Sequence, residues 1–391
     1  LEFRRVLFRS GRQPVQTPTP STGGSSGEQA LLFGGDVMLG RGIDQILAAP
    51  SDPVLYEDYI KDARGYVRLA ERANGPVPRA VSTEYVWGAA RDTLADHSLR
   101  RILNLETAIT TSDTPWADKG IHYRMHPGNV GCLMAIAPDC LVLANNHVLD
   151  WGREGLVETL ETLEAAGIPA VGAGRDRAEA AQPVSLPGAD NGRLLVFAAG
   201  HGDSGIPSDW AAGESRPGVH YLPDLGEKTT AQLAERISAC RRAGDTVVFS
   251  IHWGSNWGYQ IPEAHRRFAH ALIDTAGVDV VHGHSSHHPR TFEVHDGRLI
   301  LYGCGDLIND YEGIGETPPY RADLALLYRP TFTEGRLQRM ELDPFSIRRL
   351  QLQSCSRPDR AWLAGVLDRQ AQRFGGTVSD TGSTFACHWS N

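Results

Sequence analysis

The stretch Leu31-Leu32-Phe33-Gly34-Gly35-Asp36 joins a short apolar run to a glycine turn and a carboxylate. Four further apolar runs along the chain end in polar clusters of the same kind. In a layered α/β protein, ligands gather at the carboxyl ends of strands, so we expect the five clusters to form one site. The other four clusters are Asn104–Glu106, Asn145–His147, His252 and His282–His288.

Between these clusters, short β-rich runs alternate with amphipathic stretches of helical period, which predicts an α/β fold. Strands are expected at residues 31–33, 102–103, 141–144, 169–172, 194–199, 247–251, 278–281, 299–302 and 325–328. Helices are expected at residues 56–72, 84–94, 155–166, 230–243, 262–276 and 358–374.

Composition and charge exclude several functional classes. The 391 residues carry 47 acidic and 38 basic side chains, giving a net charge of −9, and they contain no basic block. Nucleic acid is therefore not expected as a partner. No apolar run approaches the ~18 residues that a membrane span needs. The six cysteines form no Cys-x-x-Cys pair, so buried or free thiols are expected, with one disulfide near the C-terminus as the alternative.

The chain divides into four expected segments. Residues 1–10 resemble a translated sequencing adapter, and residues 11–29, rich in Pro, Thr, Ser and Gly, are expected to form a flexible tail. Residues 30–345 are expected to form the main domain, and residues 346–391 an extension that packs on it. If the adapter has replaced the native N-terminus, both a cytoplasmic and a cell-envelope location stay open.

Two of the clusters carry carboxylates. Asp36 follows a glycine-rich turn, from which a carboxylate can reach a metal without steric cost, although a turn-capping role is the alternative. Asn104 and Glu106 lie two residues apart, so in extended backbone their side chains share a face. We expect one of them to bridge metals and the other to orient it or to bind substrate; a helix cap is the alternative.

The cluster at residues 145–147 holds two amides and an imidazole. Asn145 and Asn146 follow an apolar strand, where unsatisfied amides are costly. His147 titrates near neutral pH, so it can bind a metal or transfer a proton, and Asp150 can orient its ring. A polar turn before a helix is the alternative.

Histidines dominate the remaining clusters. His252 directly follows a strand, and the run His282–His288 holds four imidazoles in seven residues. Imidazole suits zinc, manganese, iron and other first-row metals, so these residues are candidate ligands. A purely structural histidine loop is the alternative.

The order of these motifs resembles the CapA family of poly-γ-glutamate capsule biosynthesis proteins, within the calcineurin-like metallophosphoesterase fold. The similarity runs from about Leu31 to Tyr328. It is carried by Gly35–Arg41, Asn104–Thr107, Ala144–His147, His252–Gly254, Gly283–His287 and the turn Gly303–Ile308.

The resemblance implies a four-layer α/β/β/α sandwich with two divalent metal ions, manganese, iron or zinc. It assigns Glu106 as the bridge between metals, His147 as acid or base, and Arg41 as a contact to an anionic substrate group. Asp306 and the pair His287 and His288 are second candidates for proton transfer. Asn104, Asn145 and Arg124 are expected to bind substrate. The implied metal ligands are Asp36, Glu106, Asn146, His252, His284 and His287.

Two positions depart from the metallophosphoesterase pattern. Met38 stands where the first motif has a histidine, and the second histidine of the last motif is displaced to His287 or His288. One metal position is therefore expected to be weak, remodelled or empty, which disfavours simple phosphoester hydrolysis.

The resemblance implies a metal-dependent enzyme of poly-γ-glutamate synthesis or related peptide and amide processing. An anionic polymer or peptide is the expected substrate, and membrane-associated capsule machinery is an expected partner. The alternatives are a phosphoesterase, a peptide epimerase, and a non-catalytic component of capsule assembly or export. The segments 51–81 and 116–126, rich in aromatic and basic residues, are candidates to cover the site, with surface packing as the alternative.

Overall fold

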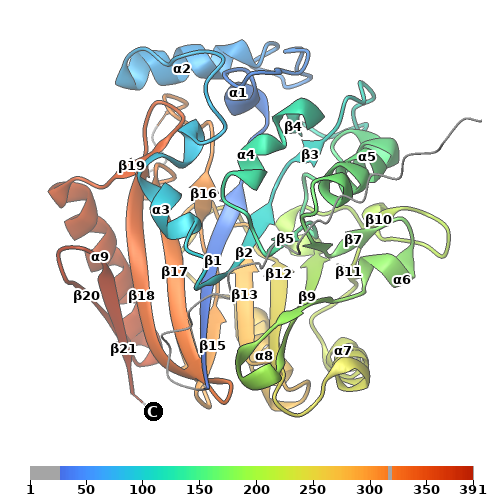
Figure 1. Ribbon diagram of the computed structural model, residues 1–391, viewed down its shortest axis with the longest axis vertical. Coiled ribbons are helices and arrows are strands. Elements are labelled where there is room, and N and C mark those ends of the chain that lie inside the picture. The colour runs from blue at the N-terminus through green and yellow to red at the C-terminus, as the bar shows by residue number, and fades with distance from the viewer. Residues whose placement is uncertain (1–26, 316–318, 391) are drawn as a thin grey trace, which may run out of the picture.

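Two large β-sheets lie face to face, and helices cover their outer faces (Figure 1). The computed structural model describes residues 27–315 and 319–390. The expected adapter and most of the expected tail lie outside the described residues. Within the described part, all six cysteines are free thiols, and no helix has the length and apolar character needed to cross a bilayer.

The first sheet places parallel strands beside antiparallel ones. Strands β1, β2, β5 and β6 run parallel, and β16 pairs with the end of β1. The order is β20-β21-β18-β17-β1-β2-β5-β6, with β19 paired to β18. The bounds are β1 Glu28–Val37, β2 Arg100–Leu105, β5 Cys140–Val142, β6 Ala170–Val171, β16 Asp306–Ile308, β17 Leu324–Thr333, β18 Arg336–Ile347, β19 Leu352–Ser354, β20 Gly376–Asp380 and β21 Phe385–Trp389.

The second sheet has the order β11-β9-β12-β13-β15-β14, with β8 paired to β9. Its central strands β9, β12, β13 and β15 run parallel. The bounds are β8 Val184–Pro187, β9 Arg193–His201, β11 Tyr221–Leu222, β12 Thr246–His252, β13 Val280–His284, β14 Phe292–His295 and β15 Arg298–Leu301. Two small ribbons pair β3 Ala108–Ile109 with β4 Arg124–Met125, and β7 Ala173–Gly174 with β10 Gly218–Val219.

Helices flank both sheets (Figure 1). The α-helices are α1 Arg41–Asp44, α2 Arg64–Asn74, α3 Arg91–Leu94, α4 Gly131–Met134, α5 Gly152–Ala165, α6 Arg177–Ala180, α7 Glu227–Cys240, α8 Glu263–Asp274 and α9 Arg357–Ala371. Short 3-10 helices span Tyr85–Ala90, Pro127–Asn129, Ala189–Asn191, Gly202–Ser204, Ser208–Trp210 and Gln372–Phe374.

Three apolar clusters separate the layers. Alternate residues of β1 point to opposite faces: Leu31 and Phe33 pack against the second sheet, whereas Leu32 packs under helices such as α5. On the far side of the second sheet, residues such as Phe249 pack against α7 and α8. The predicted four-layer α/β/β/α sandwich of metallophosphoesterase type is therefore confirmed.

The structure corrects two local expectations. The helix expected over 56–72 begins only at Arg64, because a bridge between Val54 and Asp62 and a hydrogen bond from Ala63 N to Pro53 O fold the preceding segment into a loop. The tail expected up to residue 29 ends earlier, since Glu28 already pairs with β17. Strand β18 crosses the domain boundary expected after residue 345. Strand β21, which belongs to the expected C-terminal extension, pairs with β18.

Parallel pairing sets the polar clusters side by side. Asp36 at the end of β1 is in register with Asn104 of β2 and Asp306 of β16. In the second sheet, His252 of β12 is in register with His284 of β13. Because the two sheets face each other, the carboxyl ends of both sets of strands meet at one edge of the sandwich.

Candidate metal centre

Two groups of buried metal-ligating side chains share Asp36. One group joins Asp36 with His252 and His284, and the other joins Asp36 with His287 and Asp306. In each group the three ligand atoms lie within 4.8 Å of one another. The first sheet supplies the carboxylates, while the second sheet and the loop after β13 supply the imidazoles.

In the first group, two imidazole nitrogens face each other. Nδ1 of His252 lies 2.7 Å from Nδ1 of His284, and Oδ1 of Asp36 lies 4.0 Å from the same His284 atom. Nε2 of His252 lies 3.1 Å from Oδ1 of Asn146. With no cation bound, one of the two facing Nδ1 atoms must carry the hydrogen of their contact, and a cation between them would take its place. Two facing imidazole nitrogens and a carboxylate suit a divalent cation.

The second group contains the displaced histidine. Nδ1 of His287 lies 3.0 Å from Oδ1 of Asp306, and Asn309 donates to the other oxygen of Asp306. The Tyr311 hydroxyl donates a hydrogen bond to the Met38 sulfur at 3.7 Å. His287 and Asp306 together supply a nitrogen and an oxygen ligand beside the methionine.

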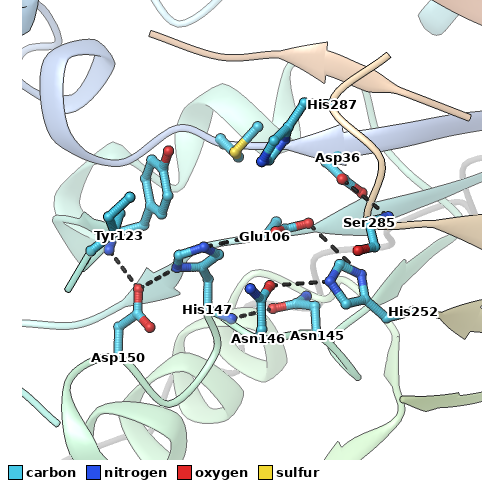
Figure 2. A network of polar contacts seen from close by, with 12 residues as sticks. Asp36, Glu106, Tyr123, Asn145, Asn146, His147, Asp150, His252, Ser285 and His287 are labelled. Atoms are coloured by element: carbon cyan, nitrogen blue, oxygen red, sulfur yellow. Dashed lines mark hydrogen bonds and ion pairs between the residues drawn. The ribbon is translucent and has the colours of Figure 1, made fainter. Parts of the chain in front are cut away.

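Glu106 lies between the ligand groups and the proton-transfer candidate. Its Oε2 is 3.9 Å from His252 Nδ1, and its Oε1 is 3.9 Å from His147 Nε2 (Figure 2). Burial, followed by the negative charges of Asp36 and Asp306, raises the pKa of Glu106 well above its usual range. Burial and the charge of Asp306 raise the pKa of Asp36 to about 7.

The raised pKa values of Asp36 and Glu106 have a common cause. Three carboxyl groups are enclosed together, and burial disfavours their charged forms. A divalent cation would offset this negative charge and hold the carboxyl groups ionised. The donor set and its charge therefore fit a metal.

Asn104 and Asn145 are fully buried and bond within the protein. Asn104 Nδ2 donates to Asp36 and to Glu106, at 2.8 and 3.0 Å. Asn145 Nδ2 donates to Asn104 Oδ1 at 3.0 Å and to Leu105 O at 2.8 Å. Expected as substrate contacts, both instead have the geometry of supports that hold the carboxylates in place.

Arg41 is enclosed, with its donors already used. Its guanidinium pairs with Asp310 and Glu57, donates to the Tyr66 hydroxyl, and lies over the Tyr66 and Tyr123 rings. Protein groups satisfy the charge and hydrogen bonds of Arg41 in this structure, and a substrate contact at Arg41 stays a prediction.

Arg124 lies on the expected covering segment, where its guanidinium contacts other loops of the protein. It donates to the carbonyls of Ser112 and Asp52, and it lies 3.8 Å from the centre of the Trp151 ring. These contacts fasten the segment to its neighbours, and the expected role of Arg124 in substrate binding stays a prediction.

His147 is held by a network that the sequence indicated only in part. Its Nδ1 lies 2.6 Å from Oδ2 of Asp150, which also accepts from the Tyr123 backbone N–H (Figure 2). Lys119 Nζ lies 2.6 Å from the other Asp150 oxygen and 3.0 Å from His147 Nδ1. Burial lowers the pKa of His147 to about 4, so its ring is neutral at pH 7.

Lys119 was not a sequence candidate. It lies in a loop 28 residues before His147, and only the fold brings the two side chains together. No motif or spacing in the sequence marks this lysine as part of the site.

A cleft of about 930 Å³ opens beside His287. Trp257, Tyr311 and Tyr320 supply aromatic walls, and Arg348 is an exposed cation among its lining residues. Next to the cleft, the His288 ring stacks on Tyr320 at 4.7 Å. The cleft is larger than a single amino-acid residue requires, and His287 of the second ligand group is among its lining residues.

The chain belongs to the family described as the bacterial capsule synthesis protein PGA_cap, which matches residues 30–311. The resemblance inferred from the motifs is thereby confirmed.

Individual relatives carry related names. A Mycobacterium tuberculosis protein named "Probable polyglutamine synthesis accessory protein" is 46% identical over 351 residues, covering 88% of this chain and 92% of that protein. The "PGA biosynthesis protein CapA" of Bacillus subtilis is 27% identical over 280 residues, covering 71% of this chain and 62% of that protein. The "Capsule biosynthesis protein CapA" of Bacillus anthracis is 28% identical over 194 residues, covering 50% and 46%.

We predict that Gly35→Ala disrupts the approach of Asp36 to Asp306. A Cβ at residue 35 would lie 1.7 Å from the Gly305 carbonyl oxygen, which accepts the Asp36 backbone N–H. We expect urea unfolding to show a loss of at least ~2 kcal/mol, as for overpacked cores. Gly120→Ala is the control, because no atom lies within 4 Å of its added Cβ. Equal stability of the two variants would contradict the close packing described here.

Proposed function

We propose that this protein takes part in synthesis of a capsule-type or poly-glutamate polymer, as a metal-dependent enzyme acting on amide bonds of an anionic chain. The observation that carries the proposal is the shared position of Asp36 in two buried ligand groups. Family membership supports the role in polymer synthesis. The chemistry of the donor set supports metal dependence.

The proposed ligands divide between two cations. His252, His284 and Asn146 would hold one cation, while His287 and Asp306 would hold the other, with Asp36 common to both. Glu106, which lies 3.9 Å from His252 Nδ1, would add a further carboxylate to the site. Imidazole and carboxylate ligands suit manganese, iron or zinc. Such cations polarise carbonyl groups and lower the pKa of bound water.

Asp306 changes its proposed role in this scheme. Expected to transfer protons, it lies instead within the second ligand group beside His287. We propose that these two residues serve the metal position that Met38 would otherwise leave without a histidine.

We propose that His147 accepts a proton at Nε2 and later returns it. Asp150 contacts Nδ1, which favours a proton on that atom and leaves Nε2 open as an acceptor toward Glu106. Lys119 adds a positive charge that limits protonation of the ring. A neutral imidazole can accept a proton from a nucleophile and later return it to a leaving amine.

We propose that the substrate chain lies in the aromatic cleft. An acidic polymer would be attracted to Arg348 at the rim, and the rings of Trp257 and Tyr320 would pack against its backbone and methylene groups. Phosphoester hydrolysis is the second candidate, because the fold is that of the metallophosphoesterases.

We predict the metal content of three single variants. Purified wild-type protein should hold about two equivalents of manganese, iron or zinc, measured by plasma mass spectrometry after reconstitution and desalting. Asp36→Ala should retain the least metal, because Asp36 belongs to both groups. His252→Ala and His287→Ala should each lose about one equivalent.

His388→Ala is the matched control, since His388 is exposed on β21. Metal near zero in reconstituted wild-type protein would overturn the proposed function, and equal losses in His388→Ala would show that the assay is not specific for the site.

We predict that His147→Ala retains its metal but loses activity. Removal of a positioned acid or base costs typically ~10²- to 10⁴-fold in rate. The measurement is turnover of γ-glutamyl amides, peptides and phosphoesters by wild-type and variant proteins with matched metal content. Activity on amides alone supports the first candidate, and activity on phosphoesters alone supports the second. Unchanged activity would refute the role of His147.

We predict that Arg348→Glu weakens binding of a poly-γ-glutamate oligomer at low salt by at least about five-fold, which corresponds to ~1 kcal/mol. Calorimetric titration would measure it, with a neutral polyamide of equal length as the comparison ligand. Arg349→Glu is the control, because this exposed neighbour is not among the cleft-lining residues. Equal weakening by both variants would indicate attraction by net charge instead of a cleft contact.

A further inference from the structure

We propose that Ser250 and His282 are positioning residues that fix the proton of His284 and turn its Nδ1 lone pair toward the metal. This inference rests on the metal site proposed above. It adds two residues that lie outside both ligand groups, and it specifies which nitrogen of His284 binds.

A chain of three contacts runs from the ligand group to the other sheet. Nε2 of His284 lies 3.0 Å from the Ser250 hydroxyl, which lies 3.0 Å from Nδ1 of His282. Nε2 of His282 lies 3.0 Å from the carbonyl oxygen of Gly34 in β1. All three side chains are fully buried, so water does not compete for these contacts.

The proton positions follow from what each atom can do. The Gly34 carbonyl can only accept, so Nε2 of His282 must carry a hydrogen. The polar contacts of the His282 ring among the described residues are the Gly34 carbonyl and the Ser250 hydroxyl; with Nε2 donating to the carbonyl, Nδ1 of a ring that carries one hydrogen is an acceptor. The Ser250 hydroxyl therefore donates to Nδ1 of His282.

Ser250 has one hydroxyl proton, and the hydrogen bond to His282 Nδ1 uses it. The Ser250 oxygen can therefore only accept a hydrogen bond from His284. Nε2 of His284 consequently carries the hydrogen, which leaves the lone pair on Nδ1. That atom lies 2.7 Å from His252 Nδ1 and faces Asp36, within the first ligand group. The alternative acceptor for Ser250, the His282 carbonyl at 3.4 Å, is more distant and would leave His282 Nδ1 unsatisfied.

The strand register makes this arrangement possible. Ser250 is paired with His282, and two residues further on His252 is paired with His284, so all four side chains share one face of the second sheet. The His282 ring also packs on Phe33 of β1, with 4.9 Å between ring centres. The contact to Gly34 thus links the strand that carries Asp36 with the strands that carry the imidazoles.

The proposal is tested with variants that keep or remove the hydrogen-bond donors and acceptors of Ser250 and His282. His282→Leu removes donor and acceptor, whereas His282→Gln restores one of each. Ser250→Ala removes the hydroxyl, and Ser346→Ala is its control, a buried serine of β18 in the other sheet. Metal affinity is measured by chelator competition on folded protein.

We expect ~10- to 100-fold weaker metal binding for His282→Leu and Ser250→Ala, as for other supports of metal ligands. His282→Gln and Ser346→Ala should remain close to wild type. Equal affinity of all variants would overturn the proposal while leaving the metal site intact.

The metal-free wild-type protein provides a second readout that does not depend on variants folding. Nitrogen-15 shifts of the His284 ring should show hydrogen on Nε2 and none on Nδ1. Hydrogen on Nδ1 would overturn the proposal. If the wild-type protein binds no metal and its His284 still carries hydrogen on Nε2, the proposed function fails and the positioning network stands.

Discussion

The parallel pairing of β1 with β2 and β16 is the constraint on which the site depends. It holds carboxyl groups close together although their negative charges repel one another. Asp36, Asn104 and Asp306 occupy neighbouring positions by register alone. Burial and mutual charge raise the pKa values of Asp36 and Glu106. The fold tolerates this cost because hydrophobic contacts of three core clusters hold the strands.

The second sheet brings imidazole side chains to the same edge of the sandwich. His252 and His284 stand in register on adjacent strands, and the proposed contacts through Ser250 and His282 reach back to β1. On the other side of the site, His147, Asp150 and Lys119 form a separate buried network. Glu106 lies near His252 and His147 alike, so it joins the ligand region to the proton-transfer region.

The sequence predicted the layers and the meeting of the clusters, since apolar periodicity and strand-end motifs are local properties. It did not predict β18, whose apolar residues are interrupted by charged residues and Pro344. It also did not predict the partners of Arg41 and Arg124 within the protein, because a guanidinium suits a substrate group as well as partners that only the fold supplies. Glu57 and Asp310, which neutralise Arg41, lie 16 and 269 residues away along the chain. Lys119 was missed for the same reason.

The apolar layer between the two sheets affects which substitutions within that layer the site tolerates. Contacts among Phe33, Val196, Val248 and Val280 are non-directional, so they permit small sliding of one sheet over the other. Successive residues on a strand are ~3.3 Å apart, whereas metal–ligand distances are held to about ±0.2 Å. Substitutions in this layer can therefore spoil the alignment of carboxylates and imidazoles at a small loss of stability. The interior valines should thus tolerate a narrower range of side-chain volumes than apolar residues under the outer helices.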